Sequence, residues 1–250
     1  MQHDKIVVGV TLGRWQTNCF VVGDRAAGSC VVIDPGEGGA AAVPDVLTRL
    51  DLRCEAILLT HGHIDHYWAM PDLARSLDVP VRMHPADRWL WDNPAAGFGA
   101  TAEQAPAVLE QQFGLRWDPP TERLEDLAHG DRLSYGGVRL DVHHNPGHTP
   151  GHVTFLSGDL QGADVDFAMA RHHSLDGAVL FSGDLVFAGS IGRTDFPRGS
   201  IQDMMRSLVD TVLPLADDTL ILSGHGPDTT VGTERATNPF LAQANAHARD

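Results

Sequence analysis

The chain has 250 residues, of which 42% are hydrophobic, enough for a domain with a substantial core. Its formal net charge of −15 and its single lysine, Lys5, argue against a nucleic-acid partner, which would need a basic surface. No apolar run approaches the ~20 residues of a membrane-spanning helix, and residues 1–5 lack the features of a secretory signal. We therefore expect a cytoplasmic protein with a small-molecule substrate and no membrane partner; the oligomeric state is left open.

The first half of the chain alternates apolar strands with helical segments. Strands are expected over 5–11, 16–24 and 29–34, where apolar runs are separated by turn-forming residues. The elements expected next are a short helix over 44–50, a strand over 56–59, a helix over 67–77 and a strand over 79–84. Residues 85–128 are less regular; we expect a helix near 102–113 and a lid or wall in the remainder.

The second half returns to strands, expected over 132–135, 137–143, 152–157, 178–182 and 219–223. Residues 158–176 are interpreted as a polar excursion, a polar segment between two predicted strands. The tail beyond Ala242 is expected to fray. A helix is expected over 200–213, with Ser200 as its N-cap and Asp203 three residues later. Nothing marks a domain boundary, so residues 1–250 are interpreted as one domain of two packed sheets with helices outside.

Cys19, Cys30 and Cys54 are odd in number and widely spaced, and each lies in or beside an apolar run. These features favour buried thiols over a disulfide or a metal site.

The most informative stretch is Thr60-His61-Gly62-His63-Ile64-Asp65-His66, which follows the expected strand over 56–59. Two histidines spaced two apart at a strand end point the same way, because side chains alternate along a strand. Imidazole and carboxylate groups suit zinc, iron or manganese. Four such groups exceed the three protein ligands that one catalytic zinc usually takes, so the stretch indicates two metals.

Three distant residues of the same chemical type also lie where predicted strands end. Each is preceded by a glycine, which permits close approach of the backbone. They are His148 in Pro146-Gly147-His148, Asp184 in Ser182-Gly183-Asp184 and His225 in Ser223-Gly224-His225. If these loops meet at one edge of a sandwich, seven ligand groups converge. Asp34 and Thr60 are candidates for orienting the imidazoles, whereas His143, His144, His152, His172 and His173 are not expected to be ligands.

With these motifs in order, the chain resembles the metallo-β-lactamase fold superfamily, and within it the glyoxalase II-like hydrolases. The first stretch matches the H-x-H-x-D-H motif of the superfamily, and the resemblance spans about residues 6 to 240. It implies an α/β fold, a four-layer αββα sandwich in which two mixed β-sheets are flanked by helices.

The resemblance also implies a division of the ligands between two divalent metal ions, expected to be zinc, with iron or manganese as alternatives. His61, His63 and His148 would hold the first metal, while Asp65, His66 and His225 would hold the second. Asp184 would bridge the two, and Asp65 and Asp184 are the residues expected to be catalytic. A hydroxide between two such cations is nucleophilic near neutral pH, so no serine or cysteine nucleophile is required.

The activity implied is hydrolysis of a thioester, such as S-D-lactoylglutathione to D-lactate and glutathione. Arg193, in the segment Gly192-Arg193-Thr194-Asp195-Phe196, would bind a substrate carboxylate, although an ion pair with Asp195 is an equal alternative. Only 25 residues follow His225, without a lysine, so the helical glutathione-binding domain of two-domain glyoxalase II is not expected. The chain looks closer to the single-domain bacterial hydroxyacylglutathione hydrolases.

A persulfide dioxygenase with a single Fe(II) is the alternative function, because that branch shares both the histidine motif and the Gly-Arg-Thr-Asp-Phe segment. A metal-binding protein without activity is a third interpretation, and the presence of all seven ligand-type residues argues against it.

Overall fold

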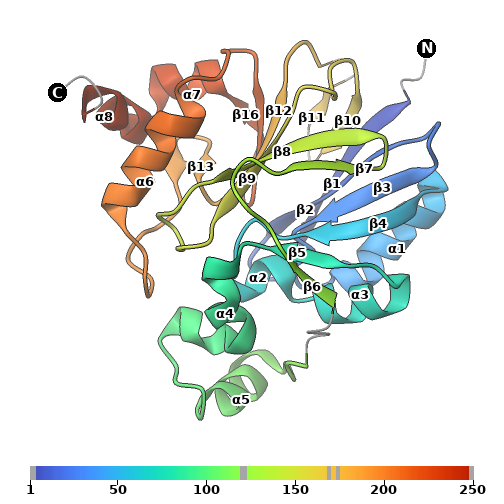
Figure 1. The fold of residues 1–250 in the computed structure, drawn as a ribbon, viewed down its shortest axis with the longest axis vertical. Helices are drawn as coiled ribbons and strands as arrows, with labels where there is room; N and C mark the ends of the chain where they lie inside the picture. Colours follow the sequence, from blue (N-terminus) through green and yellow to red (C-terminus); the bar gives the residue numbers. More distant parts are fainter. Residues whose placement is uncertain (1–3, 119–122, 168–169, 173–174, 248–250) are drawn as a thin grey trace.

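A computed structural model describes residues 4–118, 123–167, 170–172 and 175–247. Two sheets lie face to face between two layers of helices (Figure 1). The first sheet has eight strands in the order β11-β10-β1-β2-β3-β4-β5-β6. Their bounds are Ala170–His172, Asp164–Phe167, Lys5–Leu12, Thr17–Asp24, Ser29–Ile33, Arg53–Leu58, Val81–Met83 and Leu124–Asp126.

The second sheet has six strands in the order β16-β15-β12-β9-β8-β7. Their bounds are Thr229–Thr230, Leu220–Ser223, Val179–Gly183, Val153–Ser157, Val138–His144 and Arg132–Tyr135. A separate two-stranded ribbon pairs β13 (Val186–Phe187) with β14 (Ser190–Ile191).

Helices cover the outer face of each sheet (Figure 1). The helices on the first sheet are α1 (Gly39–Leu50), α2 (Ile64–Tyr67) and α3 (Met70–Leu77). Those on the second sheet are α6 (Ile201–Ser207), which continues as a π-helical turn over Leu208–Val212, α7 (Val231–Thr237) and α8 (Pro239–His247). The shorter α4 (Arg88–Asp92) and α5 (Ala105–Val108) extend below the sandwich in the view of Figure 1. No helix in the described part of the chain is long and apolar enough to cross a membrane.

The period-two pattern of the strands explains why there are four layers. In β1, Ile6 and Val8 point to the cluster that includes α1 and α3, while Val7 points to the cluster between the sheets. The same alternation in β4 sends Ile57 to the helices and Ala56 to the inner core. A strand with two buried faces reads as a continuous apolar run, as these strands do. On the other side, residues of β12 and β15 pack against α6 and α8 in a third cluster.

The expected fold class is confirmed, and the strands expected in the first 34 residues lie within a residue or two of their observed bounds. Several element predictions were wrong. The helix expected over 44–50 begins at Gly39, and the helix expected over 67–77 is two helices, α2 and α3. The tail expected to fray beyond Ala242 is helical to His247, where Leu241 and Ala244 are buried in the third cluster.

The interpretation of residues 158–176 as a polar excursion was also wrong. This segment returns to the first sheet, where β10 pairs in parallel with β1 and β11 forms the edge. Val165 and Phe167 are buried, while Asp164 and Asp166 alternate with them and make the segment look polar. The three cysteines are free and buried, as expected.

Helix α6 begins as the capping pattern predicts. The Ser200 hydroxyl accepts a hydrogen bond from the Asp203 amide at 3.2 Å, which satisfies one of the free N–H groups of the first turn. The Ser200 amide in turn donates to the Gly147 carbonyl at 2.8 Å. The cap therefore attaches α6 to the loop that carries His148.

Replacing Ser200 with Ala should lower the free energy of unfolding by about 1 kcal/mol, because the Asp203 amide loses its acceptor. Chemical denaturation measures this change. Ser200→Asp is the matched control, since aspartate caps helices equally well and should retain most of the stability. Equal losses in both variants would show that the cap does not stabilise α6.

A pair of histidines joins the two sheets at one end of the sandwich. The rings of His84, after β5, and His144, at the end of β8, stack with centroids 4.0 Å apart. Burial and the neighbouring His144 together lower the pKa of His84 to about 4, while Asp126 opposes the shift. His84 is therefore neutral in the folded chain at neutral pH, whereas an unfolded histidine takes up a proton near pH 6.5.

Because the folded pKa of His84 is depressed, stability should fall as the pH drops from about 6.5 towards 4. In the His84→Asn variant this fall should be smaller by about 1 kcal/mol between pH 7 and pH 5, a figure reduced for partial exposure of the ring. Denaturation of both proteins at the two pH values measures the difference, in which contributions of other histidines cancel. Parallel pH profiles would contradict the assignment.

Candidate metal centre

The functional side chains lie on loops that follow parallel strands. Asp34 follows β3 and the His61–His66 stretch follows β4, and these two strands are parallel neighbours in the first sheet. Asp184 follows β12 and His225 follows β15, which are parallel neighbours in the second sheet. The carboxyl ends of parallel strands meet at one edge of a sheet, and in α/β proteins this edge is the usual place for a binding site.

His148 comes from the turn between the antiparallel strands β8 and β9. Its position depends on Gly147, whose φ of +149° favours glycine. A Cβ atom on Gly147 would lie 2.5 Å from the Met204 backbone of α6. Gly224 has a similar role beside His225, because its Cβ would lie 2.4 Å from Asp184 Oδ1. These glycines allow the backbone to approach the site closely.

The structure brings all seven predicted ligand residues together, in two groups. In the first group, His61 Nε2 lies 3.1 Å from His63 Nδ1, which lies 2.8 Å from His148 Nε2. In the second group, His66 Nε2 lies 3.2 Å from His225 Nε2.

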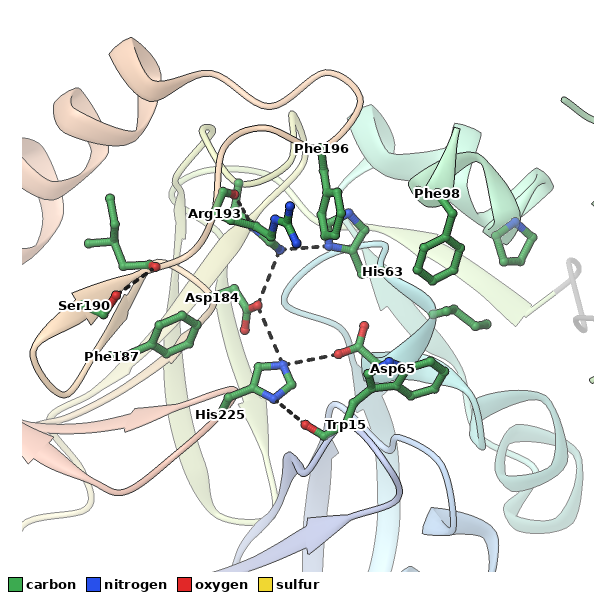
Figure 2. A pocket seen from close by; sticks show the side chains of 15 residues that line it. Trp15, His63, Asp65, Phe98, Asp184, Phe187, Ser190, Arg193, Phe196 and His225 are labelled. Atoms are coloured by element: carbon green, nitrogen blue, oxygen red, sulfur yellow. Dashed lines mark hydrogen bonds and ion pairs between the residues drawn. The ribbon is translucent and has the colours of Figure 1, made fainter. Parts of the chain in front are cut away.

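Carboxylates complete the second group and join it to the first. Asp65 Oδ2 lies 3.2 Å from His225 Nε2 and 3.5 Å from His66 Nε2. Asp184 reaches both groups, with Oδ1 3.4 Å from His66 Nε2 and Oδ2 3.4 Å from His148 Nε2. Figure 2 shows Asp184 between His63 and His225.

Four of the five imidazoles are oriented by a partner on their other nitrogen. Thr60 Oγ1 lies 3.1 Å from His61 Nδ1, and Asp34 Oδ2 lies 3.0 Å from His66 Nδ1. Such partners are typical of metal-ligating histidines, because they fix the ring orientation. The remaining two partners are main-chain carbonyl groups: that of Arg193 for His148 Nδ1 at 2.7 Å, and that of Trp15 for His225 Nδ1 at 3.1 Å.

Burial and mutual proximity shift the charges of the cluster. Burial and the neighbouring His148 lower the pKa of His63 to about 3, although Asp65 and Asp184 oppose the shift. Burial would raise the pKa of Asp65, but His66 and His225 lower it to about 2. Burial likewise opposes ionisation of Asp184, yet His66 and His148 hold its pKa well below the usual range. Ionised carboxylates and a neutral His63 are the forms that bind a cation.

His66 differs from His63. Burial acts to lower its pKa, but Asp65 and Asp184 raise it well above the usual value. A cation placed between these groups takes over the role of the His66 proton, so that binding of the cation is coupled to release of a proton.

This donor set fits divalent metal ions. Ligand-type atoms of three overlapping triads lie within 4.8 Å of one another: His61, His63 and His148; His61, His66 and Asp184; and Asp65, His66 and His225. Asp184 Oδ1 is buried and has no hydrogen-bond partner among the described residues. A buried carboxylate oxygen without a donor is costly unless a cation compensates for it. The cluster can therefore bind metal ions.

One supporting residue was missed by the sequence analysis. Asp87, which was not singled out, is fully buried and accepts hydrogen bonds from the Gly62 amide at 2.9 Å and the Gly151 amide at 2.7 Å. It also accepts one from the Thr149 hydroxyl at 2.6 Å. Asp87 thus joins the loop of His61 and His63 to the loop of His148. The sequence signal was its place just after another strand, β5, in the same parallel series.

His152, expected to support the site or to be solvated, is fully buried beside it. Its Nε2 accepts a hydrogen bond from the Asp184 amide at 3.0 Å, and its ring stacks on His61 at 5.3 Å. His152 therefore helps to hold the loop of Asp184. His173 lies outside the described residues.

A cavity of about 410 Å³ opens over the cluster. Figure 2 shows Trp15, Phe98, Phe187 and Phe196 around the mouth, with Asp65, Asp184 and His225 at the floor. The Arg193 guanidinium lies at the rim, where it bonds Asp195 through two contacts of 2.7 Å. Of the two roles considered for Arg193, the structure shows the ion pair.

Comparison with known proteins agrees with this architecture. Residues 12–162 and 173–225 match the family model of the metallo-β-lactamase superfamily. An uncharacterised protein of Mycobacterium leprae is 38% identical, over 94% of this chain and 98% of its own. The hydroxyacylglutathione hydrolase GloC of Haemophilus influenzae is 35% identical, over 93% and 96% of the two chains.

Two solved structures share the fold over 93% of this chain and 98% of their own. The B3 metallo-β-lactamase BLEG-1 superposes with a TM-score of 0.74 at 32% identity. The protein TTHA1623, solved in a di-iron-bound form, superposes with a TM-score of 0.70 at 34% identity. The chain therefore belongs to the metallo-β-lactamase superfamily.

Proposed function

We propose that this protein is a dinuclear metal-dependent thioester hydrolase of the glyoxalase II type. The observation that carries the proposal is the position of Asp184, whose two carboxylate oxygens face His66 on one side and His148 on the other. A carboxylate in this position suits a pair of cations. The similarity to GloC, named a hydroxyacylglutathione hydrolase, supports this choice of substrate class.

The roles proposed for the side chains follow from their geometry. His61, His63 and His148 would hold one metal, Asp65, His66 and His225 the other, and Asp184 both. When bound, the two ions supply Lewis acidity and a nucleophilic hydroxide near neutral pH. Asp34, Thr60 and two main-chain carbonyl groups keep four of the five imidazoles turned to the cluster. Zinc is the proposed metal, with iron or manganese compatible with the same donors.

The cavity walls favour a thioester over a more polar ester or phosphate. Ile64, Phe98 and Phe196 line it with apolar surface that can exclude water from the acyl group and the sulfur. A thiolate is a stable leaving group, so no side chain has to donate a proton to it. This matches the cavity, where no lysine or tyrosine is among the lining residues.

Replacing Asp184 with Ala should remove the group shared by both cation sites. We expect the purified variant to lose about one of two metal ions and its thioesterase activity to fall at least ~1000-fold, since the hydroxide loses the dinuclear site. Elemental analysis and hydrolysis of S-D-lactoylglutathione measure the two effects. Asp159→Asn, which alters an exposed ion pair with Arg139 on the second sheet, is the control for folding and purification.

Two outcomes with the wild-type protein would replace the proposal. One iron per chain with rapid oxygen uptake on glutathione persulfide would make it a persulfide dioxygenase. Turnover of a β-lactam in preference to every thioester would place it with the lactamase activity named for BLEG-1. A panel of thioesters, a persulfide and a β-lactam therefore tests the function in one experiment.

Asp87 is proposed as a positioning residue for the first metal. It touches no ligand-type nitrogen of the cluster but bonds the amides of Gly62 and Gly151 on two ligand-bearing loops. Without the Asp87 carboxylate, the two loops should no longer hold His63 and His148 in a fixed relative position, although both proposed ligands remain.

The variant Asp87→Ala should bind metal about 10- to 100-fold more weakly, as expected for loss of a group that supports the ligands. Competition with a chelator measures the affinity, and circular dichroism checks the fold. Asp126→Asn, at an exposed carboxylate in the neighbouring strand, should leave the affinity unchanged. Unaltered affinity in Asp87→Ala would assign Asp87 a role in folding only.

A further inference from the structure

The loop that carries His225 is less enclosed than the other ligand-bearing loops. The His225 side chain is 28% exposed, whereas the side chain of His66, which it faces, is fully buried. The loop begins where β15 ends, at Ser223. Packing around the ring therefore does less to fix His225, and its position depends on how the backbone of residues 223–226 is held.

Asn18, the second residue of β2 in the first sheet, donates three hydrogen bonds to this loop. Its side-chain amide donates to the Ser223 carbonyl and to the Gly226 carbonyl, both at 2.9 Å. Its main-chain amide donates to the Gly224 carbonyl at 2.7 Å. The carbonyl of His225 itself accepts from the Ser223 hydroxyl at 2.8 Å. Asn18 thus binds the carbonyl groups on both sides of the ligand.

The chemistry of the loop suits asparagine at this position. Carbonyl oxygens only accept hydrogen bonds, so the NH2 group of the Asn18 amide faces them. The other end of the amide, Oδ1, accepts from the Thr11 hydroxyl at 2.8 Å. Asn18 is 1% exposed, so that water does not replace these partners. The amide is therefore fixed from both ends, and an aspartate of the same shape would have no N–H to donate.

The turn before Asn18 contacts the same group of ligands at two further points. The Trp15 carbonyl lies 3.1 Å from His225 Nδ1 (Figure 2). The Thr17 hydroxyl donates to Asp65 Oδ2 at 3.3 Å. His225 and Asp65 both belong to the second group of ligands. The hairpin of β1 and β2 is therefore attached to that group.

We propose that Asn18 is a positioning residue for the second metal, because it holds the backbone on both sides of His225. The inference rests on the two-metal centre of the proposed function. The first group is supported by a different residue, Asp87, which bonds the Gly62 and Gly151 amides. Loss of the Asn18 amide should therefore weaken binding of the second metal and leave the first unchanged.

The test measures the zinc affinity of each group separately, by competition with a chelator. His148→Ala removes a ligand of the first group and leaves the second intact, whereas His225→Ala does the reverse. Adding Asn18→Ala should weaken zinc binding about 10- to 100-fold in the His148→Ala protein, because the loop of His225 loses two hydrogen bonds. In the His225→Ala protein the same change should alter the affinity by less than about 2-fold.

Asp87→Ala is the matched control, since Asp87 is also fully buried but holds the loops of the first group. It should give the opposite pattern, with weaker zinc binding in the His225→Ala protein and unchanged binding in the His148→Ala protein. A general loss of stability would weaken binding in both proteins. The reciprocal pattern therefore separates positioning from a structural role.

If Asn18→Ala does not fold, Thr11→Val gives the same test from an exposed position. Valine retains the shape of threonine in β1 but removes the hydroxyl that fixes Asn18 Oδ1. Zinc binding in the His148→Ala protein should weaken about 3-fold, as expected for loss of one hydrogen bond, and binding in the His225→Ala protein should not change.

The results separate the role of Asn18 from the proposed function. Equal weakening in both proteins, or no weakening in the His148→Ala protein, would overturn that role. If the wild-type chain binds fewer than two zinc ions, the two-metal centre fails and the inference fails with it. If the reciprocal pattern is found but the wild type hydrolyses no thioester, the role of Asn18 stands and the thioesterase proposal fails.

Discussion

The site depends on holding five imidazoles and two carboxylates within contact distance in a buried place. Each imidazole loses hydration there, and several ring nitrogens face one another at about 3 Å, with His63 Nδ1 and His148 Nε2 at 2.8 Å. Such an arrangement is unfavourable for protonated rings, which repel, and Asp184 Oδ1 makes no hydrogen bond to any described residue, with His66 Nε2 3.4 Å away. The rest of the fold compensates for this cost through rigid strands, glycines that allow close approach, and partners such as Asp34. Metal binding relieves the same strain, because a cation satisfies all of these groups together.

The sequence predicts the parts of the fold that local patterns determine. Apolar runs such as residues 30–33 give strands whose two faces are both buried, and the ordered His and Asp motifs give all seven residues of the candidate metal cluster. The division of ligands came from the resemblance to a family, since spacing alone could not assign His148 or His225 to a particular partner. His148 is 85 residues away in the sequence from His63, which it faces, and His225 is 159 residues away from His66.

What the sequence did not predict depends on contacts between distant segments. The strand β10 looks polar because Asp164 and Asp166 alternate with buried residues, and its parallel pairing with β1 is not visible locally. Asp87 has an ordinary sequence context, and its importance arises from bonds to residues 25 and 64 positions away. The helix α8 is stabilised by packing of Leu241 and Ala244 rather than by a strong local pattern.

Each group combines residues that follow strands of both sheets. His148 follows β8 of the second sheet and faces His63, which follows β4 of the first. His225 follows β15 of the second sheet and faces His66, which also follows β4. A cation held by either group is thus a cross-link between the two halves of the sandwich. During synthesis neither group can be completed before the second half emerges, and the later one must wait for residue 225. If the proposed metals bind here, completion of their sites is accordingly a late step of folding, and the metal-free chain should be more open to proteases at the junction between the sheets.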